Sequence, residues 1–574
     1  MKKPRSDSRR TRQAERKNPP APSETQDPRA GDILARHQRM YDIRGNFNSN
    51  WQTVAERVRP NQADFTMQWA EGQRRTNKVF DDTAPQACEN GVAALESLLC
   101  PASRQWHGLS ARDKDLREKV IVRQWLEEVN DCLFAVRYAP AANFQSQIHE
   151  TLGDIMTFGN GPFLVDDIVG IGIRYRSLPL AYTFGMENAA GMIDIIHREW
   201  SMTPSAVYDA WKRGIIDTVP ERIASEYAVK SNSDKTWTFI HAVEPAQEGY
   251  GDGKPFASCI VCKETQQTVK ESGYYTQPIF IARYRVNSRE TYGRGPGLDC
   301  LPTILQLNEM EKADIRITQR AADPPLLSID DANLPAFNLR SNSINAGYLS
   351  TDGKPLIAPL GSSSNFQVLD KKLEFKQAIV RRAFLNDIIS ILSEHPDMTA
   401  TQVLQLAQER GYLVAPIIGR IQNELMGPTI TREIDILHRA GQLPEPPSIV
   451  KGRGRRFDYD IVYTSFSQTA QKQSKALAIG MTLQQAAPLF QAQPDLMTKM
   501  LNLPRTFEEL ALANDAPAGI LNTPEEQQAM DEAAIQQQQL TNMANLAGPA
   551  SQAIKNLADA NKSATAATPA GGLQ

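Results

Sequence analysis

The chain has 574 residues, which is too long for one hydrophobic core and predicts two to four domains. A hydrophobic fraction of 41% and a charged fraction of 22% are typical of a folded protein, and a net charge of −3 argues against a general nucleic-acid coat, which is usually basic. With no apolar run of about 18 residues, no signal-peptide pattern and only 6 cysteines, the sequence excludes a membrane protein and favours a reducing, intracellular origin.

The first stretch, residues 1–30, is basic and poor in apolar residues. Because such a segment buries too little apolar surface to offset its chain entropy, we expect a disordered tail. It either touches nucleic acid or an acidic partner, or only keeps the protein in solution.

Helical patterns dominate the next stretch, up to residue 158. A helix is expected from residue 31, with a second piece over 51–58 that ends before Pro60. Thr83 and Gln86 have the spacing of a capping box, so a helix should begin there. Two more helices are predicted over 113–138 and 143–158, the last ended by Gly159.

Short β patterns then take over, interrupted by a helix over 204–212. They lie at 163–165, 171–175, 192–196, 237–240, 258–262 and 279–286. Helices followed by a strand-rich segment predict an α+β fold class.

Residues 292–402 contain two long helices around a small β insert. The first, over 301–322, is so polar after Met310 that it cannot be buried in the core of its own monomer. The second, of about 28 residues over 366–392, should be roughly 42 Å long. Its apolar stripe consists of Leu369, Leu373, Val380, Phe384, Ile388 and Leu392, with Leu385 and Ile389 beside it. A polar first helix predicts a subunit that sits beside copies of itself.

Further helices are expected over 399–410 and 414–440, the latter ended by Gly441. A strand over 457–463 and a helical stretch from 468 follow, and the Gln- and Ala-rich end after 523 should be partly disordered.

The order of several short motifs resembles the head-to-tail connector, or portal protein, family of T7-like podoviruses, over roughly residues 31–477. The motifs are Phe80-Asp81-Asp82-Thr83-Ala84, Pro101 with Trp106, Phe158-Gly159-Asn160-Gly161, Tyr292-Gly293-Arg294-Gly295-Pro296, Leu307-Asn308, Asp323-Pro324-Pro325, Met398-Thr399-Ala400-Thr401 and 441–444. Each motif alone is weak, whereas the ordered set is specific.

The resemblance implies a portal fold assembled as a ring. The implied parts are a basic tail (1–30), an α+β wing (31–292), a first stem helix (293–323), a small α/β clip (324–365), a second stem helix (366–392), a tunnel loop (393–398), a wing helix and strand (399–467), a helical crown (468–522) and a Gln/Ala-rich tail (523–574).

The resemblance also implies a function. Such proteins form a dodecameric ring at one capsid vertex of the virion, assembled in the bacterial cytoplasm. The ring nucleates procapsid assembly with scaffolding and major capsid proteins, docks the terminase large subunit, passes double-stranded DNA, and then carries the tail adaptor or tail tube protein.

Two interpretations of the stem charges stay open. Because a channel that passes DNA both ways should not grip it, cations are expected to touch phosphates only intermittently. The candidates are Lys371, Lys372, Lys376, Arg381, Arg382 and, in the tunnel loop, His395. Alternatively, the same cations pair with a neighbouring subunit. The candidate residues for contacts between subunits are Glu309, Glu311, Lys312, Asp314, Arg316 and Arg320.

No enzyme and no cofactor is expected. Cys259 and Cys262 have zinc spacing, but no second pair follows and a strand would put the two thiols on opposite faces. The glycines around Pro296 lack the Gly-Lys-Ser/Thr of a nucleotide loop and favour a structural turn. The alternatives are another phage structural protein of internal or scaffold type, and an intracellular thiol or metal enzyme.

Overall fold

The computed structural model describes residues 27–463 except 71, 169, 171, 230–234, 248–249, 324–325, 329–337, 339, 341–342, 346–347, 360–365, 387–413 and 452–457, together with 476–488 and short pieces from 502 to 539. The chain divides into two compact units. The first contains the described residues of 1–106 and 132–443, and the second those of 107–131, 444–464 and 468–574. Within the described ranges, every helix is too short or too polar to span a bilayer.

The first unit begins with one continuous helix, α2 (Pro28–Val58), so the expected division into two pieces is wrong. Asp27 caps its N-terminus by accepting from the Arg29 N–H. The centre stays helical because Arg44 is buried and its guanidinium donates to the carbonyls of Leu180 and Thr183. Tertiary contacts therefore hold the helix together where its sequence is only weakly helical.

Two helices pack near the end of α2. α3 (Thr83–Leu99) begins one residue earlier than a Thr83 cap predicts, with Asp82 at the N-cap. The N–H and hydroxyl of Thr83 both donate to Asp81 instead of forming a capping box with Gln86. α6 (Phe144–Phe158) confirms the prediction, and Gly159 ends it in the left-handed region at φ 84°.

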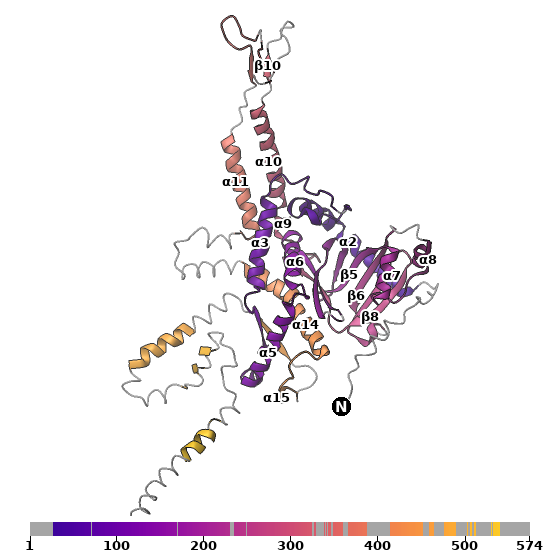
Figure 1. The fold of residues 1–574 in the computed structure, drawn as a ribbon, viewed down its shortest axis with the longest axis vertical. Coiled ribbons are helices and arrows are strands. Elements are labelled where there is room, and N and C mark those ends of the chain that lie inside the picture. The colour runs from indigo at the N-terminus through magenta and orange to yellow at the C-terminus, as the bar shows by residue number, and fades with distance from the viewer. Residues whose placement is uncertain are drawn as a thin grey trace, which may run out of the picture. The chain divides into compact units, whose positions relative to one another are not determined.

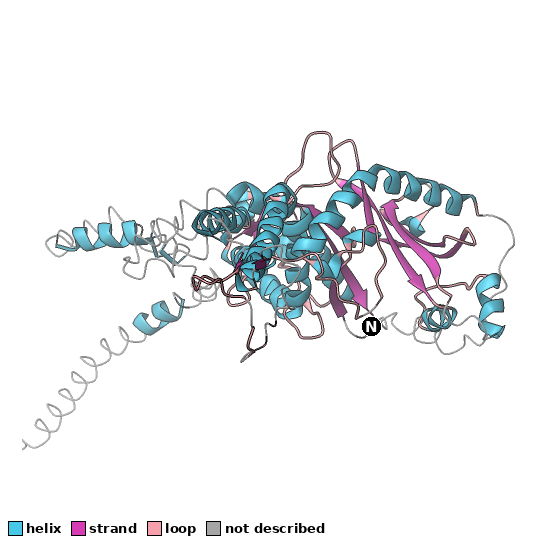
Figure 2. Ribbon diagram, turned by 90° about the horizontal axis from the view of Figure 1, so that it is seen from above, coloured by secondary structure: helices cyan, strands magenta, loops and turns pink. Residues whose placement is uncertain are grey.

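An antiparallel sheet of five strands follows, in the order β4-β5-β6-β7-β8. The strands are β4 (Thr183–Glu187), β5 (Ile193–Met202), β6 (Trp237–Pro245), β7 (Phe256–Cys262) and β8 (Gln267–Tyr274). Helices cover both faces (Figure 2): α2 packs on Ile240 and Val261, whereas α7 (Pro204–Lys212) and α8 (Glu221–Val229) pack on Phe239. The order of helices before strands confirms the α+β class.

A second, three-stranded sheet has the order β3-β2-β9, with β2 (Asn160–Ile168), β3 (Gly172–Ser177) and β9 (Ile279–Arg283). Leu164 and Ile281 of this sheet pack against Ile196 and Val243 of the larger one. The sequence reading missed β4, which is short and contains Gly185, and β8, a mostly polar edge strand with little apolar alternation.

The long helix pair continues the first unit (Figure 1). The chain leaves along α10 (Leu301–Ala322), passes through β10 (Leu326–Ser328) paired with β11 (Ile357–Pro359), and returns along α11 (Phe366–Ala383). The bounds of α10 agree with the prediction. α11 ends at Ala383 rather than near 392, because Leu385 takes a left-handed φ of 64°.

Residues 414–440 are helical as predicted, with a π segment (Gln422–Met426) before α14 (Gly427–Ala440). Gly441 ends this helix at φ 67°. The expected helix over 399–410 lies outside the described residues.

In the second unit, β1 (His107–Ala111) pairs antiparallel with β12 (Tyr459–Tyr463), the latter as predicted. The expected helix over 113–138 is interrupted, and forms α4 (Lys114–Arg117) and α5 (Val120–Arg137), whose last turns belong to the first unit. α15 (Ser448–Lys451), a helix over 476–488 and the short pieces from 502 to 539 make up the rest of the described part, so most of the expected crown lies outside it.

Candidate functional site

Two glycine motifs that are far apart in the sequence, at 158–161 and 292–297, pack against each other at the start of the long helix pair. A Cβ atom on Gly159 would lie 2.4 Å from the Gly295 nitrogen, and one on Gly297 would lie 2.6 Å from the Thr157 carbonyl oxygen. Asn160 joins the same segments, because its side chain accepts from the Gly293 N–H at 2.7 Å and donates to the Gly293 carbonyl at 3.0 Å. The glycine turn is structural, as predicted, and it fixes where α10 begins.

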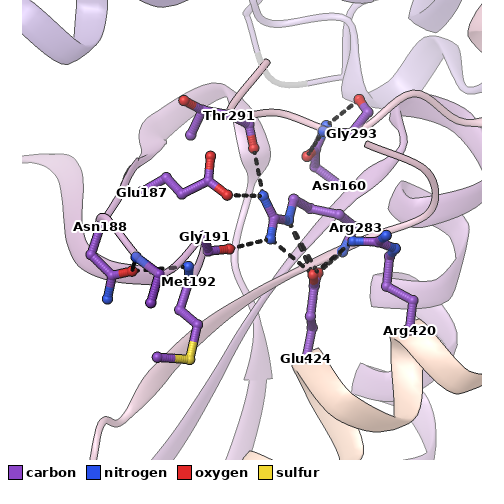
Figure 3. A network of polar contacts seen from close by, with 11 residues as sticks. Asn160, Glu187, Asn188, Gly191, Met192, Arg283, Thr291, Gly293, Arg420 and Glu424 are labelled. Atoms are coloured by element: carbon purple, nitrogen blue, oxygen red, sulfur yellow. Dashed lines mark hydrogen bonds and ion pairs between the residues drawn. The ribbon is translucent and has the colours of Figure 1, made fainter. Parts of the chain in front are cut away.

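Arg283 anchors this turn to the rest of the first unit (Figure 3). Its side chain is 5% exposed. The guanidinium donates to Glu424 at 2.9 Å, to Glu187 at 3.2 Å, and to the carbonyls of Thr291 and Gly191. Glu424 lies in the π segment and also accepts from the Arg283 backbone N–H. One buried cation thus ties β9, the turn before α10 and the helix over 414–440 together.

The segment before α3 is bound by both long helices. The Asn308 side-chain oxygen accepts from the N–H of Phe80 at 2.8 Å, and its nitrogen donates to Ile304 within α10. From α11, Gln377 donates to the Asp81 carboxylate at 3.1 Å. Two further sequence motifs, at 80–84 and 307–308, therefore meet in space.

The end of α11 rests on α3. The Phe384 side chain is fully buried, and its carbonyl oxygen lies 2.2 Å from the point where a Cβ on Gly91 would stand. When the Asn386 amide is oriented to donate, it reaches the carbonyls of Phe384 and Ala87. The left-handed Leu385 follows directly, so this contact sets where the helix stops. We call these three contacts around Gly159, Asn308 and Gly91, with the Arg283 network, the stem base.

Above the stem base, α10 turns its polar side chains outward. Glu309, Arg316 and Arg320 are exposed, whereas Glu311, Lys312 and Asp314 are half-buried. Lys312 lies 3.8 Å from Glu309 and 5.3 Å from the centre of the Phe80 ring. Partial burial and the nearby carboxylates of Asp81 and Asp314 raise the pKa of Glu311. Only Ile304, Leu307 and Asn308 of α10 are buried.

The basic residues of α11 lie off its apolar stripe, as predicted. Leu373, Val380 and Phe384 are buried, whereas Phe375 on another face is 65% exposed. Among the candidate cations, Lys371, Lys372, Arg381 and Arg382 are exposed and Lys376 is half-buried. His395 and the rest of the expected tunnel loop lie outside the described residues. The structure therefore brings the described candidates together on one helix pair.

Cys259 and Cys262 lie on opposite faces of β7, which confirms the strand geometry. Cys259 packs under α2, and Cys262 packs under α7. Burial raises the pKa of the Cys259 thiol to about 11, which keeps it protonated and a poor nucleophile. In the described part of the chain, no three His, Cys, Asp or Glu side chains gather as metal ligands.

Sequence reasoning missed Arg283, Glu424, Gln377 and Gly91. Gly91 carried a usable signal, since a glycine inside a helical pattern often marks a close backbone approach. The polar residues carried none, because Glu424 lies 141 positions from Arg283 along the chain and Asp81 lies 296 positions from Gln377.

Comparison with known proteins identifies the family to which this chain belongs. The family model described as bacteriophage head to tail connecting protein matches residues 30–521. The portal protein of Salmonella phage epsilon15 is 23% identical over 548 residues, which covers 92% of this chain and 96% of that protein. The probable portal protein of Bordetella phage BPP-1 is 22% identical over 459 residues, covering 77% of this chain and 79% of that protein.

Proposed function

The chain belongs to the family of bacteriophage head to tail connecting proteins, and we propose that it is the portal protein of a tailed phage. It forms a ring of twelve copies at one vertex of the capsid and is part of the virion. The ring is supported by α10, in which only Ile304, Leu307 and Asn308 are buried and the charged residues after Met310 are exposed or half-buried. Neighbouring copies supply the missing contacts.

In this proposal the described parts take the roles that the resemblance implied. The helices and sheets of the first unit before α10 form the wing, α10 and α11 form the stem, and β10 with β11 belongs to the clip. The stem base holds the stem at a fixed angle to the wing, because glycine contacts and the Arg283 network leave the start of α10 little freedom.

The stem lines a channel through which double-stranded DNA enters during packaging and leaves during ejection. Exposed charges of both signs on α10 and α11 suit a wall that does not hold phosphate tightly, since every cation in contact with phosphate adds salt-dependent affinity. Lys371, Lys372, Lys376, Arg381 and Arg382, with His395, are the proposed DNA-facing residues.

The ring docks the terminase large subunit during packaging and the tail adaptor or tail tube protein afterwards. It nucleates procapsid assembly with scaffolding and major capsid proteins in the bacterial cytoplasm. The protein itself is not an enzyme, and the separate terminase supplies the energy of packaging, since this sequence carries no Gly-Lys-Ser/Thr nucleotide loop.

Electron microscopy of the purified protein tests the ring directly, together with its mass in solution. We expect rings with a central channel and a mass near twelve times 63.8 kDa. A monomer or dimer without rings under every salt condition would contradict the proposal.

A charge swap separates the two roles of the stem cations. If Lys371 pairs with Glu309 of a neighbour, K371E and E309K should each weaken the ring and the double variant should restore it. If Lys371 instead faces DNA, the double variant should form rings no better than E309K, and K371E should alter packaging alone. A swap of Asp252 and Lys254, a pair on the wing, serves as the control.

A further inference from the structure

A polar band crosses one face of the five-stranded sheet between two apolar clusters. At one end, Ile196 and Val243 pack against the smaller sheet, and at the other end Phe239 packs under α7. The row between them pairs Arg198 of β5 with His241 of β6, and continues to Ile260 and Lys270. Burying charged groups beside apolar clusters costs free energy unless the charges are paired, so a charged row between two such clusters indicates a role beyond packing.

Arg198 makes no ion pair within 4.0 Å with any described carboxylate. The Arg198 side chain is partly exposed, and its guanidinium lies 5.0 Å from the centre of the Trp200 ring. Burial, followed by repulsion from Arg176, lowers the pKa of Arg198 to about 10. Burial and Arg198 also lower the pKa of His241 to about 3, so His241 is neutral and adds no charge.

Two more arginines approach from the smaller sheet. Arg174 and Arg176 stand two residues apart on β3, so both point to the same face, and both are exposed without an ion pair to any described residue. Asp166 lies opposite Arg174 in the register and is the nearby carboxylate that acts on Arg198. Three cations thus surround one resident anion.

The wall beside this cluster holds another incompletely satisfied cation. Arg432 of α14 lies 5.1 Å from the centre of the Tyr274 ring, and its Nη1 donates to Thr276 and lies 3.8 Å from the Asp435 carboxylate. Its Nε is buried and donates to no described residue. The region therefore has more positive charge and more donors than the described residues accept.

We propose that Arg174, Arg176 and Arg198 form a docking site for the carboxylates of an acidic segment of another protein. Paired N–H groups of guanidinium match the two oxygens of a carboxylate, and a bound carboxylate would relieve the repulsion between Arg176 and Arg198. This site goes beyond the portal function proposed above and does not depend on ring formation.

The partner is recognised through side chains rather than by adding a strand to β3. The outer edge of β3 is already used, because the N–H of Tyr175 donates to Ala142 and that of Ser177 donates to Gln147. A peptide fits better than duplex DNA, since the cluster converges on one place and includes Asp166, whereas DNA phosphates are spread along two strands.

Fluorescence anisotropy with a labelled polyglutamate peptide tests the site on the full chain, with polyglutamine as the uncharged control. We expect R174Q/R176Q to weaken polyglutamate binding by about tenfold or more, because two charged partners are lost. D166N should tighten binding, since it removes the resident carboxylate. R39Q is the matched control, because Arg39 is an exposed arginine on α2, which covers the opposite face of the same sheet.

R198M extends the test to the partly buried arginine, with thermal unfolding to check its fold. If R198M does not fold, the R174Q/R176Q and D166N variants still test whether the arginines bind polyglutamate. The proposal is overturned if polyglutamate does not bind, or if R39Q weakens binding as much as R174Q/R176Q. Duplex DNA that binds with the same arginine dependence and displaces the peptide would overturn it in favour of a nucleic-acid site.

Discussion

The stem base and the outer part of the stem belong to the same helix pair, yet they are stabilised in opposite ways. At the base, polar groups are buried and paired: Asn308 accepts from the backbone N–H of Phe80, and Arg283 donates to four residues. Farther along α10, charged side chains such as Arg316 and Arg320 are exposed. One region is complete within the chain, and the other presents groups for partners.

This difference separates two kinds of substitution. A change at the base should lower the stability of the single chain, because backbone contacts and buried charges cannot relax easily. A change on the outer stem should leave the chain folded and alter only assembly or DNA passage.

Gly159→Ala should cost roughly 4 kcal/mol or more of unfolding free energy, since the new Cβ combines a left-handed backbone with a clash against the Gly295 backbone. Urea unfolding at fixed protein concentration measures it. Gly45→Ala is the matched control, because Gly45 lies in α2 with open space around it and should gain about 0.5 to 1 kcal/mol. Equal effects of the two variants would refute the close packing.

Stability should fall as the pH rises from about 4 to about 7, because burial raises the pKa of Asp154 to about 7 against the attraction of Arg59. In this window the folded chain keeps a proton that the unfolded chain releases, so raising the pH favours unfolding by up to about 4 kcal/mol. Above pH 7 this contribution is constant.

Unfolding curves across this range, for the wild type and Asp154→Asn, measure the effect. The variant loses the ion pair with Arg59 and starts from a lower stability, so the slope with pH is the informative quantity. Identical slopes in the two proteins would contradict the assignment to Asp154.

Glu424→Gln should cost about 2 kcal/mol, because it leaves Arg283 buried with less compensating charge. Chemical unfolding measures the loss, and Glu290→Gln, which weakens a more exposed pair with Arg294, should cost much less. A loss at Glu424 no greater than at Glu290 would mean that the network does not fix the stem base.

Glu309→Gln and Arg316→Gln should change the stability of the folded chain by less than about 0.5 kcal/mol, because both side chains are exposed. Sedimentation velocity should nevertheless show fewer rings for these variants. Unfolding at fixed concentration, measured on the unassembled fraction, provides the comparison. A large loss of chain stability would show that α10 is already satisfied within one subunit.

The sequence alone determined that helices precede a strand-rich segment, the bounds of α7 and α10, those of α6 to within one residue, and the family. These features depend on periodicity, on glycine and proline, and on motif order, all of which act over a few residues. It also indicated that α10 is too polar for a core, as its exposure confirms.

Only the tertiary structure decided how the motifs meet. That Gly159 faces Gly295, that Asn308 holds Phe80, and that α11 stops where Phe384 meets Gly91 are contacts between segments distant in the chain. β8 escaped notice because an edge strand needs no apolar alternation, and the Arg174, Arg176 and Arg198 cluster because it joins two sheets. Local sequence determines which backbone conformations have low free energy. The pairing of distant polar groups depends instead on which surfaces the folded chain brings together.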